Sequence, residues 1–291
     1  MKRIKELWIS LLKKKSIVNI YGIVICVISI LIIVLLIGSY IVNKEDHERD
    51  YGVFLSLDAS DIDKIEGYQT LVIDAQYFSK EDIMHLKEQG STVYSYLNVG
   101  SIENFRTYYD DYSYLTLGAY ENWDEEQWMD VSSPVWQEFL VSLEEELLAK
   151  GIDGFFIDNC DVYYEYHTEE IFEGLTVILE HLMKYDMPVI INGGDTYVMD
   201  FMDMHGSAQR VMTGVNQESV WSEFDFESGN YIAQSKANRD YFKSYVESCR
   251  DDDLDVYLLE YTTDFVLKWK IKKYCADNQF HYYISDSIAL D

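Results

Sequence analysis

The sequence predicts a (β/α)8 TIM barrel preceded by one N-terminal transmembrane helix. Eight short β-rich runs alternate with helical patterns after residue 50, which is the element order of this barrel. Most of the runs are apolar throughout, as expected for parallel strands that are covered on both faces. A separate run, residues 17–42, is apolar and carries no charge. An open, doubly wound sheet is the alternative, and the count of eight strands in a segment of single-domain length favours the barrel.

The eight predicted strands are brief and are separated by turn residues or helix signals. They are GVFLSL (52–57), TLVIDA (70–75), TVYSYLNV (92–99), GFFIDN (154–159), PVIIN (188–192), RVMTGV (210–215), DVYLLEY (255–261) and HYYIS (281–285). In a barrel of this kind, the functional residues lie at the C-terminal ends of the strands and in the loops that follow them.

Helix signals lie between the strands. Ser79 is a suitable N-cap for the segment KEDIMHLKEQG, and Gly90 is a suitable C′ residue at its end. Ser133 followed by Pro134 is typical of a cap with proline at the first helical position, and it opens PVWQEFLVSLEEELLAKG. Further amphipathic helices are predicted over residues 168–187, 231–250 and 263–278.

The N-terminal region predicts a membrane anchor. Residues 17–42 exceed the roughly 20 residues that a membrane-spanning helix needs, and a cleavable signal peptide would have a shorter apolar region. A buried core helix is the alternative. Six basic residues in the first 15 predict a cytoplasmic N-terminus. We therefore expect a basic cytoplasmic tail (1–16), a transmembrane signal anchor (17–42), a linker (43–50) and a barrel domain (51–291). The expected localisation is the cell membrane, single-pass, with the barrel domain extracellular.

The chain is strongly acidic, with a formal net charge of -29. The first 50 residues contain eight basic and five acidic side chains, so the excess of acidic groups lies entirely in residues 51–291. Such a charge repels nucleic acid and anionic lipid and attracts a polycationic partner. The alternative is that the acidity only keeps the protein soluble.

The cysteines and histidines do not indicate a metal site. Cys26 lies in the apolar N-terminal run, and Cys160, Cys249 and Cys275 follow it. A Cys249–Cys275 disulfide is possible outside the cell, although the spacing does not demand it. Zinc-type cysteine pairs and the HExxH motif are absent from the sequence, so we predict no metal and no cofactor.

A long segment, residues 108–132, is predicted to be an irregular loop after the third strand. Loops of this length are uncommon in compact domains and are often functional. Its aromatic residues are Tyr108, Tyr109, Tyr112, Tyr114, Tyr120, Trp123 and Trp128. Aromatic rings pack against the apolar faces of sugars, so the segment is interpreted as a carbohydrate platform. The alternative is that some of these rings only hold the loop on the barrel.

Nearly every predicted strand ends in a carboxylate or an amide. These strand-end residues are Asp58, Asp74, Asn98 with Glu103 and Arg106, Asp158 with Asp161, Asn192 with Asp195, Glu218, Glu260 with Tyr261, and Asp286. Histidine does not recur at these positions and the GxSxG motif is absent, which argues against a serine hydrolase. A ring of carboxylates suits glycoside hydrolysis, or the binding of a hard cation by oxygen ligands.

Three stretches carry a family resemblance: YSYLNVGSIENFR (94–106), MDVSSPVWQEFL (129–140) and KGIDGFFIDNCDVYY (150–164). On these motifs, the chain from Tyr51 to Asp291 resembles the endo-α-1,4-polygalactosaminidase family of glycoside hydrolases (family 114). This family includes the hydrolase domain of Pel exopolysaccharide systems. The resemblance implies a barrel enzyme that cleaves galactosamine-containing polymers.

The resemblance also implies roles for individual residues. Asp158 corresponds to the family's catalytic aspartate and is predicted to be the nucleophile. Glu218 is predicted to be the acid/base, with Glu223 as its alternative. Glu103 and Arg106 resemble a paired Glu and Arg of the family and are expected to form an ion pair. The predicted substrate-binding residues are Asp74, Tyr96, Glu103, Arg106, Asp161, Tyr163, Asn192, Glu260, Tyr261 and Asp286.

The predicted function is therefore a membrane-anchored extracellular glycoside hydrolase that cleaves an amino-sugar exopolysaccharide by a two-carboxylate mechanism. Its partner is expected to be a cationic amino-sugar polysaccharide, and an exopolysaccharide synthesis complex is a further possible partner. The alternative is a non-catalytic polysaccharide-binding component of such a synthesis or export complex. A third interpretation is a metal-dependent hydrolase that uses Asp158, Asp161 and their neighbours as ligands.

Overall fold

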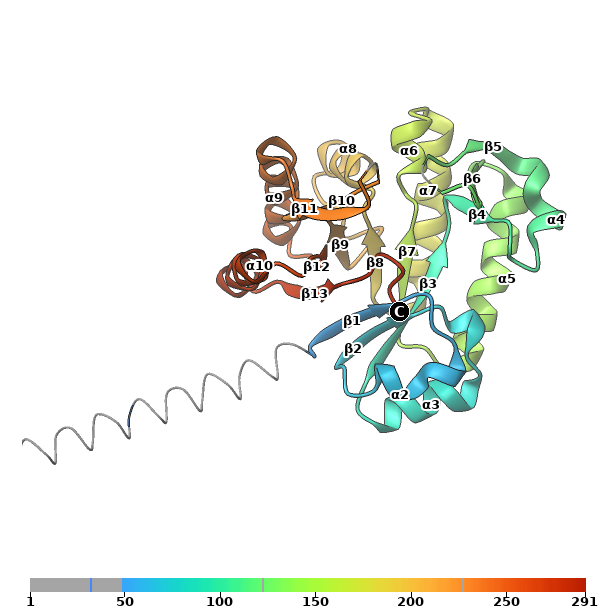
Figure 1. The fold of residues 1–291 in the computed structure, drawn as a ribbon. Helices are drawn as coiled ribbons and strands as arrows, with labels where there is room; N and C mark the ends of the chain where they lie inside the picture. The colour runs from blue at the N-terminus through green and yellow to red at the C-terminus, as the bar shows by residue number, and fades with distance from the viewer. Residues whose placement is uncertain (1–31, 33–48, 122, 227) are drawn as a thin grey trace, which may run out of the picture. The chain divides into compact units, whose positions relative to one another are not determined.

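The computed structural model describes residue 32 and residues 49–121, 123–226 and 228–291. The chain divides into two units, Met1–Glu48 and Arg49–Asp291. The second unit contains the barrel (Figure 1). The predicted cytoplasmic tail, anchor and linker fall almost wholly outside the described residues, and their boundaries stay predictions.

The predicted membrane localisation requires a correction. Within residues 32, 49–121, 123–226 and 228–291, no helix has the length and apolar character needed to cross a bilayer. On this finding, the expected localisation in the cell membrane, single-pass with the barrel domain outside the cell, is contradicted.

Eight parallel strands form the central sheet, in the spatial order β1-β2-β3-β7-β8-β9-β12-β13 (Figure 1). Their bounds are β1 (Tyr51–Phe54), β2 (Thr70–Ile73), β3 (Thr92–Asn98), β7 (Gly154–Asp158), β8 (Val189–Asn192), β9 (Gly214–Glu218), β12 (Asp255–Tyr261) and β13 (His281–Ser285). Every ladder between neighbours is parallel. The predicted eight-stranded parallel barrel is therefore confirmed in its strand order. The sixth strand, β9, begins four residues later than the predicted run at Arg210.

The barrel is nearly closed, and its seam lies between β1 and β13. Aromatic packing covers this seam, because the ring of Tyr283 lies 5.3 Å from that of Phe54 and 6.2 Å from that of Tyr68. The backbone N–H of Leu55 also donates to the carbonyl of Leu290, at 3.1 Å. The C-terminal segment thus joins the first strand to the last at the rim.

Helices follow most of the strands and cover the outside of the barrel (Figure 1). Their bounds are α2 (Ile62–Ile65), α3 (Lys80–Glu88), α5 (Pro134–Lys150), α6 (Val162–Glu165), α7 (Glu169–Leu182), α8 (Asp195–His205), α9 (Lys236–Asp251) and α10 (Phe265–Asn278). The expected cap of α3 is present, since Ser79 and Asp82 form a reciprocal capping box. Gly151 ends α5 with a φ of 92°, where a side chain would be strained.

Two of the longer helices differ from the sequence prediction. The helix predicted from Tyr231 begins at Lys236, because residues 230–233 pair with the preceding strand in a hairpin and Ser235 caps the helix. The helix α8 was not predicted, although it occupies the place of the helix that a (β/α)8 barrel requires after β8.

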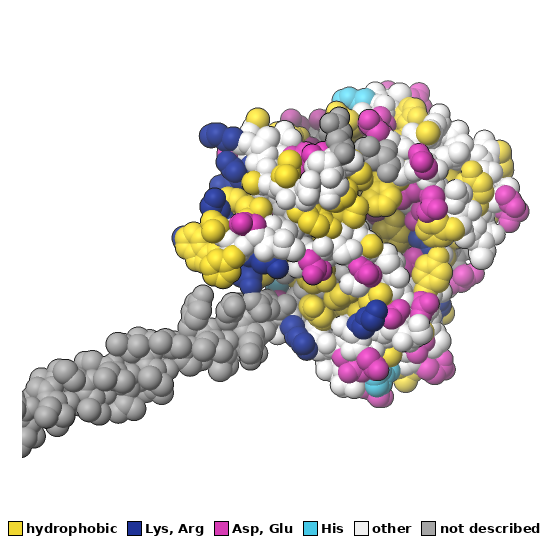
Figure 2. Space-filling model, viewed as in Figure 1, with side chains coloured by type: hydrophobic (Ala, Val, Ile, Leu, Met, Phe, Trp, Pro, Cys, Tyr) yellow, Lys and Arg dark blue, Asp and Glu magenta, His cyan; other side chains and the backbone are white. Residues whose placement is uncertain are grey.

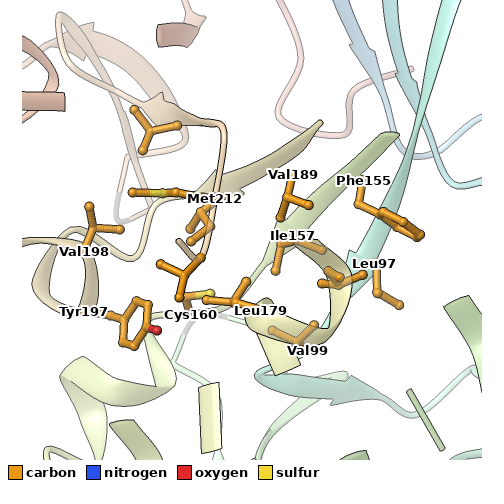
Figure 3. Close-up of a cluster of buried hydrophobic side chains, with 14 of the residues drawn as sticks. Leu97, Val99, Phe155, Ile157, Cys160, Leu179, Val189, Tyr197, Val198 and Met212 are labelled. Atoms are coloured by element: carbon orange, nitrogen blue, oxygen red, sulfur yellow. The ribbon is translucent and has the colours of Figure 1, made fainter. Parts of the chain in front are cut away.

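Side-chain alternation on the strands creates two apolar layers. One layer packs between the strands and the helices, and it includes Phe155 and Ile157 of β7 beside Leu179 of α7 and Val198 of α8 (Figure 3). The other layer fills the barrel interior, with Tyr94, Tyr96, Phe156, Ile190, Tyr257 and Leu259 among its members. Successive residues of a strand face opposite sides, so every second residue of a strand faces the barrel interior.

Two insertions lie at the C-terminal ends of the strands. The first is a three-stranded antiparallel sheet of β4 (Ser101–Glu103), β6 (Glu126–Met129) and β5 (Thr116–Ala119), with the short helix α4 (Tyr109–Tyr112). The second is the hairpin of β10 (Ser222–Asp225) and β11 (Asn230–Ala233). The segment predicted as an irregular loop over residues 108–132 therefore contains regular structure.

Several aromatic residues of the first insertion hold it on the barrel. The ring of Tyr112 lies 4.3 Å from that of Phe139 on α5, and the ring of Tyr108 lies 4.6 Å from the same phenylalanine. Other rings are exposed: Tyr114 keeps 69% of its surface accessible and Trp123 keeps 44%. The insertion thus uses part of its aromatic content for packing and leaves part of it to solvent.

The remaining sequence features concern cysteines and charge. Cys160, Cys249 and Cys275 are free and buried, so Cys249 and Cys275 do not form a disulfide. Acidic side chains are spread over the face of the molecule shown in Figure 2. This agrees with the composition, in which acidic residues outnumber basic ones by 52 to 23.

Candidate active site

The alternation of side chains along the strands places four polar side chains at one rim of the barrel interior. Asp158 ends β7, Asn192 ends β8, Glu218 ends β9 and Tyr261 ends β12. These strands are consecutive neighbours in the sheet. Side chains at every second position of a strand face the same side, and these four follow the positions that face the barrel interior. The four side chains therefore converge.

The amide of Asn192 joins the two predicted catalytic carboxylates. Its Nδ2 donates to Asp158 Oδ1 at 2.9 Å and to Glu218 Oε1 at 2.8 Å. The two carboxylates, far apart in the chain, therefore lie next to each other. Glu223, the alternative to Glu218, is on the hairpin strand β10, and the amide of Asn192 donates to Glu218 instead.

Two tyrosines supply a second hydrogen bond to each carboxylate. Tyr96 Oη donates to Asp158 Oδ2 at 3.0 Å, and Tyr261 Oη donates to Glu218 Oε2 at 2.6 Å. Burial raises the pKa of both tyrosines well above the usual value. Both hydroxyls therefore stay protonated and act as donors.

The carboxyl groups of this site have raised pKa values. Burial raises the pKa of Asp158 to about 6, against the hydrogen bond from Asn192, and the charge of Glu218 raises it further. Burial also raises the pKa of Glu218, although the bonds from Tyr261 and Asn192 lower it. Two neighbouring carboxyls whose pKa values are raised can hold a proton between them at mildly acidic pH.

A chain of hydrogen bonds supports Asn192 from inside the barrel. Asn216 Nδ2 donates to Asn192 Oδ1 at 2.6 Å, and Tyr51 Oη donates to Asn216 Oδ1 at 3.1 Å. Asn192 thus uses its oxygen as an acceptor and both of its N–H groups as donors. This arrangement fixes the orientation of the amide and with it the direction of its two N–H bonds.

Beside Asp158, a buried ion-pair cluster holds the loop after β3. Arg106 contacts Glu103 through Nη2–Oε1 at 2.9 Å and Asp74 through Nη1–Oδ2 at 2.6 Å. The expected Glu103–Arg106 pair is thus present, and Asp74 joins it. Glu103 Oε1 also lies 3.4 Å from Tyr96 Oη, which connects the cluster to the residue that donates to Asp158.

Asp161 lies in the turn after β7, close to the carboxylate pair. Its Oδ2 accepts a hydrogen bond from the backbone N–H of Gly194 at 3.1 Å. Burial raises the pKa of Asp161 to about 7, and the charges of Asp195 and Asp158 raise it as well. Asp161 is therefore a third carboxyl group of the rim, and its pKa lies close to neutral pH.

Three of the predicted substrate-binding residues, Tyr163, Asp286 and Glu260, lie away from this cluster. Tyr163 packs among His167, Phe172 and Tyr197 and donates to Asp200 at 3.0 Å. Asp286 is exposed after β13.

Glu260 faces the opposite side of β12 from Tyr261, its neighbour in the chain. Its carboxylate accepts from the backbone N–H groups of Trp221 and Ser222 at 2.9 Å and from the Ser222 hydroxyl at 2.5 Å. It therefore holds the turn that follows Glu218.

The sequence prediction missed several residues of the site. Asn216 and Tyr51 stand behind Asn192, and the parity of β9 could have identified Asn216, two residues before Glu218. Glu126 comes from the first insertion, where no periodic signal pointed to it. Burial raises its pKa to about 7, the bond from Ser101 lowers it, and the charge of Asp158 raises it. Glu126 is thus a further carboxyl near Asp158.

The described residues also bear on the metal-dependent interpretation. Over residues 49–121, 123–226 and 228–291, there is no group of three or more His, Cys, Asp or Glu side chains arranged to hold a metal ion.

A family comparison decides which class of protein this geometry belongs to. The sequence model of glycoside-hydrolase family GH114 matches residues 45–285, which is most of the chain. The chain belongs to family GH114. This GH114 protein is accordingly a glycoside hydrolase, as its sequence motifs predicted. A comparison with curated proteins gave no match.

Solved structures show the same fold. The GH114 chain is similar to the glycoside hydrolase domain of PelA from Pseudomonas aeruginosa, with a TM-score of 0.71 and 21% identity over 83% of this chain and 96% of that one. It is similar to Ega3 from Aspergillus fumigatus, solved in complex with galactosamine, with a TM-score of 0.64 and 15% identity over 84% and 93%. It is also similar to the alpha-galactosidase TtGalA from Thermus thermophilus, with a TM-score of 0.53 and 11% identity over 81% and 58%. At these identities, the likeness shows the fold alone.

Proposed function

We propose that this GH114 protein hydrolyses a galactosamine-containing polysaccharide, with Asp158 as the nucleophile and Glu218 as the acid/base. The observation that carries the proposal is the Asn192 amide, which donates to both carboxylates. Glycoside hydrolysis requires two carboxyl groups on either side of the scissile bond, one of which protonates the leaving oxygen. The position of Asp158 and Glu218 beside each other at the C-terminal rim, where barrel enzymes bind their substrates, supports this proposal.

The separation of the two carboxylates favours a retaining reaction. Asp158 Oδ1 and Glu218 Oε1 lie 2.9 and 2.8 Å from the same nitrogen, Asn192 Nδ2. The distance between these two oxygens therefore cannot exceed the sum of the two hydrogen-bond lengths. Retaining glycosidases place their carboxyl groups about 5–5.5 Å apart, and inverting ones about 6.5–9.5 Å. We therefore propose a covalent glycosyl intermediate on one carboxylate, released by water with the help of the other.

The assignment of the two roles rests on the family resemblance. An acid/base with a raised pKa can keep a proton for the leaving group, and burial gives Glu218 such a pKa. In the free enzyme, burial and, to a lesser extent, the charge of Glu218 raise the pKa of Asp158 to about 6, which favours the opposite placement of the shared proton. Protonation of Glu218 removes this repulsion, so Asp158 is more easily ionised in the state that the mechanism needs.

The substrate class follows from charge and from the structural neighbours. Ega3 was solved with galactosamine, and PelA is described as containing a glycoside hydrolase domain. Deacetylated galactosamine is cationic at neutral pH, and a chain with a net charge of -29 attracts a polycation. We propose that an amino-sugar polysaccharide with free amines is the substrate.

The predicted substrate-binding residues divide by their surroundings. Asp161 lies on the rim and is proposed to contact the sugar. Asn192, Tyr96 and Tyr261 touch the catalytic carboxylates and are proposed to position them. Asp74, Glu103 and Arg106 are proposed to support Tyr96 from behind. Tyr163, Glu260 and Asp286 stay predictions without contact to this cluster.

The test is digestion of a deacetylated galactosamine polymer by the wild type and by Asp158→Asn and Glu218→Gln. We expect both variants to lose about 10³-fold in turnover, with the polymer still bound. Asp124→Asn, an exposed change in the insertion, serves as the control. A variant that cleaves as fast as the wild type would contradict the proposal. If the wild type binds but does not cleave, the protein is a polysaccharide-binding component, for example of a synthesis or export complex.

A chelator provides a separate check. The two-carboxylate mechanism needs no bound cation, so turnover is expected to be the same with and without excess chelator. Loss of turnover that returns on adding a divalent cation would favour the metal-dependent alternative, with Asp158 and Asp161 as ligands.

A further inference from the structure

The first insertion contacts the turn that follows Asp158. Ser101 of β4 lies at the centre of this contact, where its Oγ accepts from Asn159 Nδ2 at 3.0 Å and from Asn98 Nδ2 at 2.7 Å. The same Oγ donates to Glu126 Oε2 at 2.7 Å. Asn159 Nδ2 also lies 3.4 Å from Glu126 Oε2. The carboxylate of Glu126 therefore holds a serine and an asparagine that belong to two other segments.

Asn159 is in an unusual backbone conformation. Its φ is 65°, in the left-handed region that asparagine tolerates better than most residues. It is also buried, with 4% of its surface exposed. A conformation of this kind needs surrounding contacts to persist, and the bonds to Ser101 and Glu126 supply them.

Asn159 directly follows Asp158 and contacts its carboxylate. The backbone N–H of Asn159 forms a hydrogen bond to this carboxylate and lowers its pKa. The backbone of Asp158 is fixed from the other side, since its carbonyl accepts from the N–H of Val99 at 3.2 Å. The orientation of Asn159 therefore sets the direction of one of the donors that Asp158 uses.

The chain approaches so closely here that only glycine fits at position 100. A Cβ on Gly100 would lie 1.7 Å from the carbonyl oxygen of Asn159. The β3–β4 turn and the turn after β7 are thus packed backbone against backbone. The backbones of these two turns therefore constrain each other's position.

We propose that Glu126 is a positioning residue for Asp158, acting through Ser101 and the left-handed turn at Asn159. The insertion sheet then belongs to the catalytic apparatus, and it does more than extend the substrate-binding surface. The inference rests on the proposed role of Asp158 in the reaction.

The test compares kcat and KM on the deacetylated galactosamine polymer. Glu126→Ala removes the acceptor, and Asn159→Gly keeps the left-handed backbone but removes the amide. Each is expected to lower kcat about 10-fold, with KM within about two-fold, because Asp158 acts in the transition state. Glu126→Gln still accepts a bond from Ser101 and is expected to keep most of the activity. Glu125→Ala, its neighbour, is the matched control and should be unchanged.

The double variant Glu126→Ala/Asn159→Gly tests whether Glu126 and Asn159 affect kcat through the same contact or independently of each other. Residues that act through one contact are not additive, so the double variant should be no slower than the slower single variant. Multiplying losses would overturn the proposal, as would wild-type kcat in Glu126→Ala. A rise in KM alone would also overturn it, because Glu126 would then contact the substrate directly. If Glu126→Ala does not fold, Asn159→Gly still tests the proposal, because a wild-type kcat in that variant would overturn it.

Failure of this inference can be told from failure of the proposed function. If Asp158→Asn retains turnover, the catalytic role of Asp158 is wrong. If Asp158→Asn is inactive while Glu126→Ala and Asn159→Gly keep wild-type kcat, only the positioning role is wrong.

Discussion

The carboxylates of Asp158 and Glu218 accept hydrogen bonds from one and the same side-chain nitrogen. A single amide thus sets the distance between two acidic groups that come from different strands. Because like charges repel at this distance, the pair is held by its donors and does not associate by itself. The predictions below test what each of these donors contributes.

Asn192→Ala removes the shared donor. We expect kcat to fall about 10²-fold, because small errors in the placement of reacting groups have effects of that order. KM should change little, since the bulk of the substrate contacts remain. Steady-state kinetics on the polymer measure both values, with the exposed Asn238→Ala as the control. Wild-type kcat in Asn192→Ala would show that the distance is set by other contacts.

Tyr96→Phe and Tyr261→Phe distinguish the roles of the two carboxyls. Each change removes a donor to one carboxylate and should raise the pKa of that carboxyl group, because the hydrogen bond favours its charged form. If Asp158 must be ionised, activity falls as the pH drops through about 6, and Tyr96→Phe moves this acid limb to higher pH. If Glu218 must be protonated, Tyr261→Phe moves the alkaline limb to higher pH. The measurement is kcat/KM as a function of pH. If Tyr96→Phe moves the alkaline limb and Tyr261→Phe moves the acid limb, the catalytic roles of Asp158 and Glu218 are the reverse of those proposed.

Glu260→Ala tests whether this buried residue holds the turn after Glu218. The change leaves the donors of Trp221 and Ser222 without a partner, which should lower the free energy of unfolding by about 2–3 kcal/mol. For a domain of this size, that corresponds to a Tm lower by roughly 4–10 °C. Calorimetry compares it with the exposed Glu173→Ala. An unchanged Tm together with a raised KM would instead support the substrate contact predicted from the sequence.

Salt should weaken turnover on a charged polymer. With a net charge of -29, the enzyme attracts a polyamine sugar chain, and added salt screens this attraction. We expect kcat/KM on deacetylated polymer to fall several-fold between about 0.05 and 0.5 M salt, mainly through KM. The fully acetylated polymer is the uncharged comparison. If kcat/KM depends equally on salt for both polymers, electrostatic attraction does not select the deacetylated polymer.

Stability should fall as the pH rises through the neutral range. The pKa of Asp158 is raised to about 6, and those of Asp161, Glu126, Glu144 and Glu260 are raised to about 7. Their unfolded values are near 4, so between these limits the folded protein holds protons that the unfolded chain releases. The contribution to stability is complete below about pH 4 and is lost as the pH rises through about 7. Tm should therefore be at least ~2 °C higher at about pH 5 than at about pH 8. A Tm that rises with pH would contradict these shifts.

The sequence was sufficient for the barrel because its information is local. Apolar runs such as GFFIDN and caps such as Ser79 determine strands and helices within a few residues, and the count of eight parallel strands implies a closed sheet. The motif around Asp158 was local as well, since the apolar run leads directly into the carboxylate. The helix boundary near Tyr231 was predicted wrongly because the pairing of β11 with β10 overrides the helical pattern there.

Strand parity shows where local reasoning could have gone further. Glu260 and Tyr261 were both predicted to bind substrate, but adjacent residues of a strand face opposite sides, and Tyr261 is the one that donates to Glu218. The same rule would have pointed to Asn216, which faces the interior with Glu218. Glu126 had no such signal, since it reaches the site from the insertion.

The sequence by itself determined the fold class, the family motifs and the candidate carboxylates, because each depends on residues near one another in the chain. Only the tertiary structure decided that Asp158 and Glu218 share the amide of Asn192, that Glu126 reaches the turn at Asn159, and that Glu260 serves the loop. These contacts join segments that are distant in sequence. They depend on the closure of the barrel and on the packing of the insertions, which no local pattern encodes.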